Sequence, residues 1–375
     1  MRTFSKRYRS GLLAAALFVL SACGAAPEQN EDTATAAPQQ RYNWKMVTAW
    51  PKNFPGLGTA PEYFARKVEA MSGGRMKIRV YGAGELVPAL EVFDAVSAGS
   101  AEMGHGAAYY WKGKVPEAQF FSALPFGLNG REMDAWIKYG GGGELWRELY
   151  APFNLIPVRG GNTNVQMGGW FNKEINSVED FRGLKMRIPG LGGEVLQRLG
   201  GVSVNLPGGE LYTSLQTGVI DATEFTAPYN DLAFGFYDIA KYYYYPGWHE
   251  PGAIIEFIFN KQLFEALPAD LQEIMLTAAE ATNLEMEDEF TARNSGALKE
   301  LVEKHHVDIR KFPDDLLQAL QRISRQVTDE LGTISPMAER IHASYRDFEA
   351  QVRNYHKISE EAYTKARDLP LNPDP

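Results

Sequence analysis

The chain contains very little cysteine. Its 375 residues include one cysteine, Cys23, and that residue lies close to the N-terminus. A single cysteine cannot form a disulfide within the chain, so the folded part must draw its stability from an apolar core. The same scarcity excludes a cysteine nucleophile from everything that follows residue 23.

Long apolar runs are also scarce. The run over residues 11–20 is too short to span a bilayer comfortably. It follows a basic head and precedes Ser21-Ala22-Cys23, a pattern that resembles a bacterial lipoprotein signal. We therefore expect residues 1–22 to be removed, Cys23 to carry lipid, and the protein to be periplasmic and anchored to a membrane. The alternative is an ordinary secretory signal with an incidental cysteine, which would also export the protein.

The motifs of common enzyme classes are missing as well. The sequence has no G-x-S-x-G elbow, and the glycine run at residues 140–143 lacks the Lys-Ser/Thr end of a phosphate loop. His105 and His249 lack the spaced partners that a zinc site needs. A net charge of −9 argues against nucleic acid as a partner. These absences favour a binding protein over an enzyme.

Strand and helix patterns alternate from residue 42 onward. Residues 23–41 are rich in Ala, Pro, Gln, Glu and Thr, a composition typical of a flexible tether. After them, the spacing of apolar residues predicts strands at residues 42–48 and 76–81 and helices at residues 59–72 and 88–97. This alternation predicts an α/β fold with a largely parallel sheet, and the chain is long enough for two lobes.

A short internal repeat supports two similar lobes. Residues 84–103 and 209–222 both begin with Gly-Glu-Leu and both contain a helix pattern followed by a glycine, Gly99 or Gly218. Glycine at the end of a helix suits the left-handed backbone that a helix stop requires. Chance similarity between two such units is the alternative.

The repeat also predicts where a ligand binds. Ligands of open α/β sheets lie outside the C-terminal ends of the strands. Residues 105–111, which include Tyr110 and Trp111, and residues 224–229 follow equivalent strands. We therefore expect both segments to line one cleft.

The chain becomes strongly helical beyond residue 260. Helices are predicted at residues 261–267, 268–306, 313–331 and 336–366. The last of them carries an apolar stripe of Ile341, Tyr345, Phe348, Val352 and Tyr355. Such a stripe packs either on its own domain or on a partner subunit.

Residues 181–193 form the most informative stretch. They predict a short strand over residues 184–188, stopped by Pro189-Gly190, and then a glycine-rich helix start. Arg187 ends this strand, where its planar fork can hold a carboxylate through two hydrogen bonds. The alternative is a surface arginine paired with a neighbouring acid.

Several polar residues fall at the ends of the strands around Arg187. Asn164 and Gln166 precede one strand, Glu224 ends another, and Glu250 lies in an aromatic and proline-rich turn. Amide, carboxylate and backbone carbonyl oxygens suit a hard cation such as Na⁺ or Ca²⁺. Each residue alone is explained by a turn or a surface position, so the prediction depends on their convergence.

Two longer motifs resemble a known family. Leu184-Lys185-Met186-Arg187-Ile188-Pro189-Gly190 and Leu215-Gln216-Thr217-Gly218-Val219-Ile220-Asp221-Ala222 resemble the central motif of solute-binding subunits of tripartite ATP-independent periplasmic (TRAP) transporters, the DctP-type family. The resemblance covers roughly residues 42–366. Residues 224–231 and 242–252 are similar to the branch that binds 2-oxo acids or lactate together with a metal ion.

The resemblance implies a two-lobed, periplasmic-binding-protein-like fold with a ligand cleft between the lobes and a long C-terminal helix. Lobe I would comprise residues 42–163 and 253–312, lobe II residues 164–252, and the C-terminal helices residues 313–375. The family also implies a homodimer formed through the long helix, and membrane subunits as partners.

The resemblance implies roles for individual residues. Arg187 matches the arginine that binds the substrate carboxylate, and Gln166, Glu224 and the Phe225 carbonyl match the cation ligands. The branch has Trp where this chain has Phe225, so the pocket wall differs. The remaining candidates for substrate binding are Asn164, Tyr110, Trp111 and Glu250.

Two alternatives remain from the sequence. One is a binding protein for another carboxylate, a sugar acid or a dicarboxylate, without a metal. The other is an exported metal-dependent hydrolase or lyase, which needs a positioned acid or base. Only Glu250 and His105 are available for that role, without an obvious pair.

Overall fold

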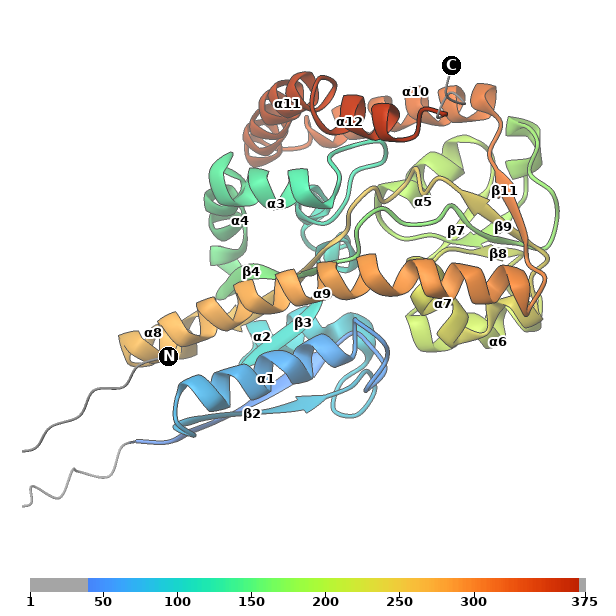
Figure 1. Ribbon diagram of the computed structural model, residues 1–375. Helices are drawn as coiled ribbons and strands as arrows, with labels where there is room; N and C mark the ends of the chain where they lie inside the picture. The colour runs from blue at the N-terminus through green and yellow to red at the C-terminus, as the bar shows by residue number, and fades with distance from the viewer. Residues whose placement is uncertain (1–39, 371–375) are drawn as a thin grey trace, which may run out of the picture. The chain divides into compact units, whose positions relative to one another are not determined.

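The computed structural model describes residues 40–370 (Figure 1). The expected signal peptide, the lipid-bearing Cys23 and the tether up to residue 39 lie outside these residues. The strands are β1 (Tyr42–Thr48), β2 (Met76–Tyr81), β3 (Met103–Ala107), β4 (Leu155–Asn162), β5 (Gly169–Phe171), β6 (Lys185–Arg187), β7 (Val202–Val204), β8 (Ala222–Thr223), β9 (Tyr242–Tyr245), β10 (Ile254–Asn260) and β11 (Asp308–Lys311). The helices are α1 (Thr59–Met71), α2 (Val92–Ser97), α3 (Gly130–Tyr139), α4 (Gly142–Tyr150), α5 (Gly190–Arg198), α6 (Leu211–Gln216), α7 (Pro228–Phe234), α8 (Lys261–Glu265), α9 (Ala269–Glu303), α10 (Asp314–Leu331), α11 (Pro336–His356) and α12 (Glu360–Arg367).

The first sheet is the centre of lobe I. Its strand order is β2-β1-β3-β10-β4. β1 is parallel to β2 and β3, whereas β10 is antiparallel to both β3 and β4. All seven residues of β10 are buried, and five of them are apolar, because a strand covered on both faces needs no alternation of apolar and polar residues.

The second sheet is the centre of lobe II, with the order β11-β9-β5-β8-β6-β7. β6 is parallel to β7 and β8, while β5 is antiparallel to β8 and β9. The two sheets confirm the predicted two-lobed α/β architecture. One apolar cluster fills the space between the first sheet, α1 and α9, and a larger cluster includes side chains of both lobes.

The parallel parts of the two sheets are built in the same way. β2-β1-β3 in lobe I corresponds to β7-β6-β8 in lobe II. The Glu102 carboxylate accepts a hydrogen bond from the Lys45 backbone N–H at 2.7 Å, and the Asp221 carboxylate accepts one from the Lys185 backbone N–H at 2.9 Å. The repeat seen in the sequence is therefore a repeated structural unit.

Two short segments cross between the sheets and pair with each other. Residues 163–168 lead from β4 to β5, and residues 246–253 lead from β9 to β10. The Gln166 backbone N–H donates to the Glu250 carbonyl at 3.2 Å, and the Gly247 N–H donates to the Gln166 carbonyl at 2.9 Å. Glycine is required at position 247, because a Cβ atom there would come within 2.2 Å of that carbonyl oxygen.

The 35-residue helix α9 is a third connection. At 1.5 Å per residue it is roughly 50 Å long, and it contacts α1 and β4 in lobe I and α7 in lobe II (Figure 1). It leads to β11, which pairs with β9 in the second sheet. The structure therefore differs from the prediction that residues 253–312 all return to lobe I, because α9 is long enough to deliver residues 308–311 to lobe II.

The C-terminal helices pack on both lobes. α10 contacts α5, and α11 contacts α3 and α4. The helix predicted over residues 336–366 is present as α11 followed by the shorter α12, with a break at residues 357–359. Ile341 and Tyr345 at the start of the apolar stripe are buried, whereas Tyr355 at its end is exposed.

The helices within residues 40–370 include none that is both long enough and apolar enough to cross a membrane.

Candidate functional site

Arg187 lies inside the protein at the end of β6. Pro189 stops the strand, and Gly190, with φ +60°, begins α5 in a left-handed conformation. The Arg187 residue is 1% exposed. The alternative of a surface arginine is therefore excluded, and a fully buried guanidinium needs a partner for every donor that it carries.

The guanidinium of Arg187 is held on three sides. Nη1 donates to the Glu224 carboxylate and, at 3.2 Å, to the Glu224 carbonyl; Nε donates to the Leu206 carbonyl at 3.1 Å; and Nη2 donates to the Tyr110 hydroxyl at 3.1 Å. The Phe225 ring lies 5.6 Å from Cζ. Burial opposes the positive charge, but Glu224, Tyr110, Tyr109 and Glu250 together outweigh it, so the pKa of Arg187 is raised.

Lobe I reaches this arginine through the 3₁₀ turn η2 (Ala108–Trp111) and Lys112, which together we call the tyrosine arm. Besides the contact of Tyr110 with Arg187, the Tyr109 hydroxyl lies 3.5 Å from Glu250 Oε2, and Lys112 Nζ donates at 3.1 Å to the carbonyl at the start of α5. Burial raises the pKa of both tyrosines, so their hydroxyls stay protonated.

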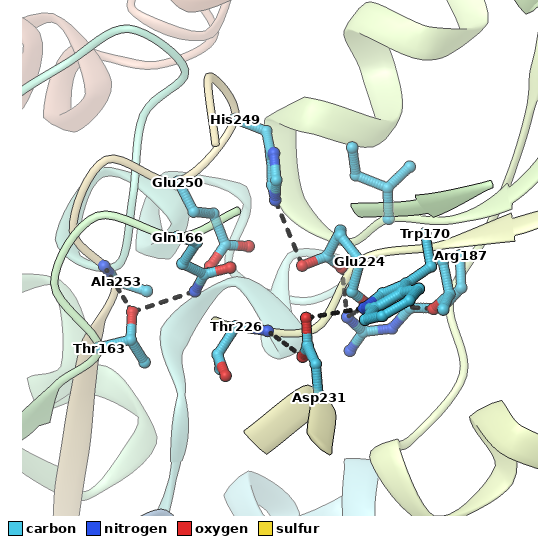
Figure 2. Close-up of polar contacts among 12 residues, drawn as sticks. Thr163, Gln166, Trp170, Arg187, Glu224, Thr226, Asp231, His249, Glu250 and Ala253 are labelled. Atoms are coloured by element: carbon cyan, nitrogen blue, oxygen red, sulfur yellow. Dashed lines mark hydrogen bonds and ion pairs between the residues drawn. The ribbon is translucent and has the colours of Figure 1, made fainter. Parts of the chain in front are cut away.

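The crossing segments contribute a second group of polar side chains (Figure 2). The Gln166 amide donates to Glu250 Oε2 at 2.7 Å and to Thr163 Oγ1 at 3.0 Å, while His249 Nε2 lies 3.3 Å from Glu224 Oε2. Glu224 therefore lies between the arginine of lobe II and the histidine of a crossing segment.

Two buried oxygens in this group have no hydrogen-bond partner among residues 40–370: Gln166 Oε1 and Glu250 Oε1. Ligand atoms of Glu224, His249 and Glu250 all lie within 4.8 Å of one another. Burial, and then the charge of Glu224, raise the pKa of Glu250 well above its ordinary value. Free acceptor oxygens beside two buried carboxyl groups suit a hard cation, so the residues present fit the predicted Na⁺ or Ca²⁺.

The structure brings together most of the residues predicted for this site. Arg187, Tyr110 and Glu224 form one set of contacts and Gln166 and Glu250 another, and the two sets meet where ligand atoms of Glu224 and Glu250 lie within 4.8 Å of each other. The ring of the neighbouring Phe225 lies against the arginine. The described residues 40–370 provide no hydrogen bond to the Phe225 carbonyl, the third predicted cation ligand.

Two predicted residues are placed elsewhere. The Asn164 amide donates to the Glu287 carbonyl at 3.1 Å and to Thr291 Oγ1 at 3.0 Å, both on α9. The Trp111 indole donates to Glu256 Oε1 at 2.5 Å, inside lobe I. Neither side chain is brought to Arg187.

Sequence reasoning missed Tyr109 and His249. Each is adjacent to a predicted residue, Tyr110 or Glu250, but strand alternation does not apply in a 3₁₀ turn or in a crossing segment. The only available signal was the unusual Trp-His-Glu-Pro-Gly turn at residues 248–252.

A cavity of about 670 Å³ lies between residues of the two lobes. The cavity is lined by residues 83–84, 86–91, 207 and 209–210, with Pro51. Between the lobes, Phe54 packs edge-on against Phe225 at 5.8 Å and lies 4.4 Å from Phe234, measured between ring centroids. The lobes are therefore in contact around a site whose charged side chains are buried.

Two α/β lobes that enclose a buried arginine and a group of acceptor oxygens define a solute-binding protein of the kind that captures small anions between its lobes. The sequence places the chain more narrowly. It belongs to the DctP family of bacterial extracellular solute-binding proteins, family 7, whose pattern matches residues 46–333.

Similar proteins have descriptions that bear on the ligand. The monocarboxylate 2-oxoacid-binding periplasmic protein of Nostoc sp. is 40% identical over 335 residues, which are 89% of this chain and 92% of that protein. A TRAP periplasmic solute-binding protein from Pseudoalteromonas atlantica, solved with bound sodium and pyruvate, is 42% identical with a TM-score of 0.85, covering 88% of this chain and 100% of that one. A TRAP transporter solute-binding protein from Bordetella bronchiseptica is 36% identical with a TM-score of 0.86, covering 88% and 97%; it was solved as a mixed-occupancy dimer with copurified calcium and picolinate in one site.

Proposed function

We propose that this protein is the solute-binding subunit of a TRAP transporter and that it captures a small 2-oxo acid such as pyruvate, or lactate, together with Na⁺ or Ca²⁺. The proposal is carried by two buried oxygens, of Gln166 and Glu250, that have no hydrogen-bond partner among residues 40–370 and lie in the same site as the buried Arg187. The ligands of the similar proteins support the same substrate class.

The arginine provides one half of the recognition. A 2-oxo acid presents a carboxylate and an adjacent carbonyl oxygen. Four of the five N–H groups of Arg187 donate to Glu224, Leu206 and Tyr110, which leaves one N–H of Nη2 for the carboxylate. The Tyr110 hydroxyl, now an acceptor for Arg187, can rotate to donate to the ligand. Because the arginine is already packed and hydrogen-bonded, little side-chain freedom is lost when the acid binds.

The oxygen cluster provides the other half. Gln166, Glu224 and the Phe225 carbonyl would hold the cation, with the free oxygen of Glu250 available beside them. A bound cation would supply positive charge to one carboxylate oxygen and to the adjacent carbonyl oxygen of the acid. Glu224 is then neutralised by Arg187 and the cation together, so its carboxylate does not repel an incoming anion.

The tyrosine arm closes the site from lobe I. Its contacts with Arg187 and with Glu250 join the two lobes across the ligand position. We therefore expect the lobes to separate for ligand entry and to close on the bound acid. Small-angle scattering should record a smaller radius of gyration with pyruvate than without it.

The location and assembly of the protein are part of the proposal. Cys23 carries lipid and tethers the protein in the periplasm, where it delivers the acid to the membrane subunits of the transporter. Apolar side chains exposed along the C-terminal helices support a homodimer: Tyr355, Ile358, Tyr363 and Leu369. Intact-mass analysis of membrane-extracted protein should show a diacyl adduct on a chain that begins at Cys23.

Calorimetry on the purified protein tests the function. Pyruvate and lactate are titrated after dialysis against chelator in Na⁺-free buffer, and again after Na⁺ or Ca²⁺ is restored. We expect strong binding only with a cation, and proton NMR should show that the acid is bound but not converted. Glu224→Gln should weaken binding by weakening the cation, whereas Glu210→Gln, an exposed acid on the same lobe, should not.

Other results would select the alternatives. If affinity is unchanged without cations and the protein prefers a sugar acid or a dicarboxylate, it is a carboxylate-binding protein that does not use a metal. Conversion of the acid during incubation would indicate an enzyme.

A further inference from the structure

Glu256 is a buried carboxyl group that the proposed capture of the acid does not use. It lies in the middle of β10, is fully buried, and is opposite Gly106 of β3 and Arg159 of β4. The register of β10 against β4 shifts between Ile255 and Glu256, which marks a bulge. Bulges re-aim side chains, and this one lies where the Glu256 carboxyl reaches the tyrosine arm.

The carboxyl of Glu256 binds the arm through one oxygen. Oε1 accepts a hydrogen bond from Trp111 Nε1 at 2.5 Å and another from the Tyr150 hydroxyl at 3.2 Å. Trp111 is the last residue of the turn that carries Tyr109 and Tyr110. Glu256 is therefore one side chain away from the turn whose Tyr110 contacts Arg187.

The surrounding sequence makes room for this contact. A Cβ atom at Gly106 would lie 2.9 Å from the Trp111 ring, so only glycine leaves space for the indole. The indole also packs on Phe93, with ring centroids 5.7 Å apart. Packing and hydrogen bonding thus both direct Trp111 into lobe I.

Stability alone does not explain an acidic residue here. Replacing buried polar groups by apolar side chains of similar volume is often neutral or stabilising for a fold. Among residues 40–370, Oε2 of Glu256 has no hydrogen-bond partner, so the carboxyl is only half satisfied. What the polar contact adds is a defined position for the turn that bears the tyrosines.

We propose that Glu256 is a positioning residue that holds the tyrosine arm against Arg187 through its contact with Trp111. This inference rests on the proposed function, since the arm matters as the part of lobe I that closes on the ligand. Glu256 itself does not touch the ligand.

The protonation of Glu256 allows a conservative test. Burial raises the pKa of Glu256 to about 8, and the groups that donate to it, an indole and a phenol, are uncharged at neutral pH. The carboxyl is therefore mostly neutral at pH 7. Glu256→Gln keeps a neutral side chain of the same shape with an acceptor oxygen, whereas Glu256→Leu removes the acceptor.

The first readout is pyruvate dissociation in buffer with Na⁺ and Ca²⁺, followed by stopped-flow fluorescence. Glu256→Leu should dissociate about tenfold faster than the wild type, the effect of losing about one hydrogen bond. Glu256→Gln should stay within about twofold of the wild type. Tyr150→Phe is the matched control, because it removes the other donor to Glu256 without altering the arm; it should lower stability in urea but leave the dissociation rate unchanged.

The second readout needs no ligand. In ¹³C-tyrosine-labelled protein, the ring signals of Tyr109 and Tyr110, assigned with Tyr→Phe variants, should shift or broaden in Glu256→Leu but not in Glu256→Gln. If Glu256→Leu does not fold, Trp111→Phe removes the same hydrogen bond from the other side and should give the same changes.

The inference is overturned if Glu256→Leu or Trp111→Phe leaves the two tyrosine signals unchanged. It is also overturned if Tyr150→Phe accelerates dissociation as much as Glu256→Leu does, because the effect would then be general destabilisation. A wild type that binds no 2-oxo acid would instead refute the proposed function, and the tyrosine spectra would still decide whether Glu256 positions the arm.

Discussion

Replacing Arg187 by methionine should cost the protein both stability and its ligand. The side chain is 1% exposed, and its loss would leave the buried Glu224 carboxylate without its guanidinium partner. Removing one partner of a buried ion pair typically costs roughly 3–5 kcal/mol. The stability of a folded protein is about 5–15 kcal/mol, so Arg187→Met should still fold but unfold at a much lower urea concentration.

The same substitution removes the guanidinium that is proposed to bind the carboxylate. Pyruvate affinity measured by calorimetry should fall on the order of 10²- to 10³-fold. Arg187→Lys keeps the charge but cannot reach Glu224, Leu206 and Tyr110 together, so its effects should be intermediate.

A double-mutant cycle with Glu224→Gln separates the ion pair from general packing. The double variant should be more stable than the sum of the single losses predicts, by more than about 1 kcal/mol, because the uncompensated charge is gone. The reasoning would be refuted by an Arg187→Met variant that loses less than about 1 kcal/mol of stability and binds pyruvate with near-native affinity.

Three further predictions concern closure, pH and assembly. Lys112→Gln removes a partly exposed contact across the lobes, so urea stability should fall by no more than about 1 kcal/mol. Pyruvate should dissociate a few times faster from this variant, and an unchanged rate would show that Lys112 does not help to hold the lobes together. Burial raises the pKa of Glu256 to about 8 and of Asp231 to about 7. In the folded protein these two carboxyl groups stay protonated at pH values at which they are ionised in the unfolded chain. The free energy of unfolding should therefore fall between pH 5 and 7 by roughly 1.4 kcal/mol per pH unit for each group. Glu256→Gln should flatten this slope in urea titrations, and an equal slope would refute a protonated Glu256. If the protein forms the proposed homodimer, Tyr355→Glu, on the exposed end of α11, should convert it to a monomer in light scattering; a persistent dimer would place the interface elsewhere.

The part of the site that lies in regular structure could be predicted from sequence. Arg187 ends a strand because proline and glycine follow it, and Glu224 follows the strand of a repeated helix–glycine–strand unit. These positions depend on residues only a few places away in the chain, so local sequence patterns can predict them. The start of the fold at β1 was predictable for the same reason.

The remaining side chains depend on residues far away in the chain. Trp111 turns into lobe I because Glu256, 145 positions away, accepts its indole N–H. Asn164 turns to α9, where its partners are 123 and 127 positions away. The backbone of Asn164 has φ +56°. Asparagine tolerates this conformation, but the neighbouring sequence does not predict it.

The arrangement of the site suggests an order for binding. Gln166 and Glu250 lie on crossing segments that are hydrogen-bonded to each other, so they should move little when the lobes separate. Arg187 and Glu224 both lie in lobe II, whose sheet holds them on neighbouring strands. Within residues 40–370, the tyrosine arm is the part of lobe I that contacts this polar group. Under the proposed function, the cation ligands and the arginine that binds the carboxylate would therefore be assembled before closure, while the tyrosines would arrive with it. Closure would then add contacts to a ligand that is already bound. The tyrosine arm should therefore affect the dissociation rate of the acid more than its association rate.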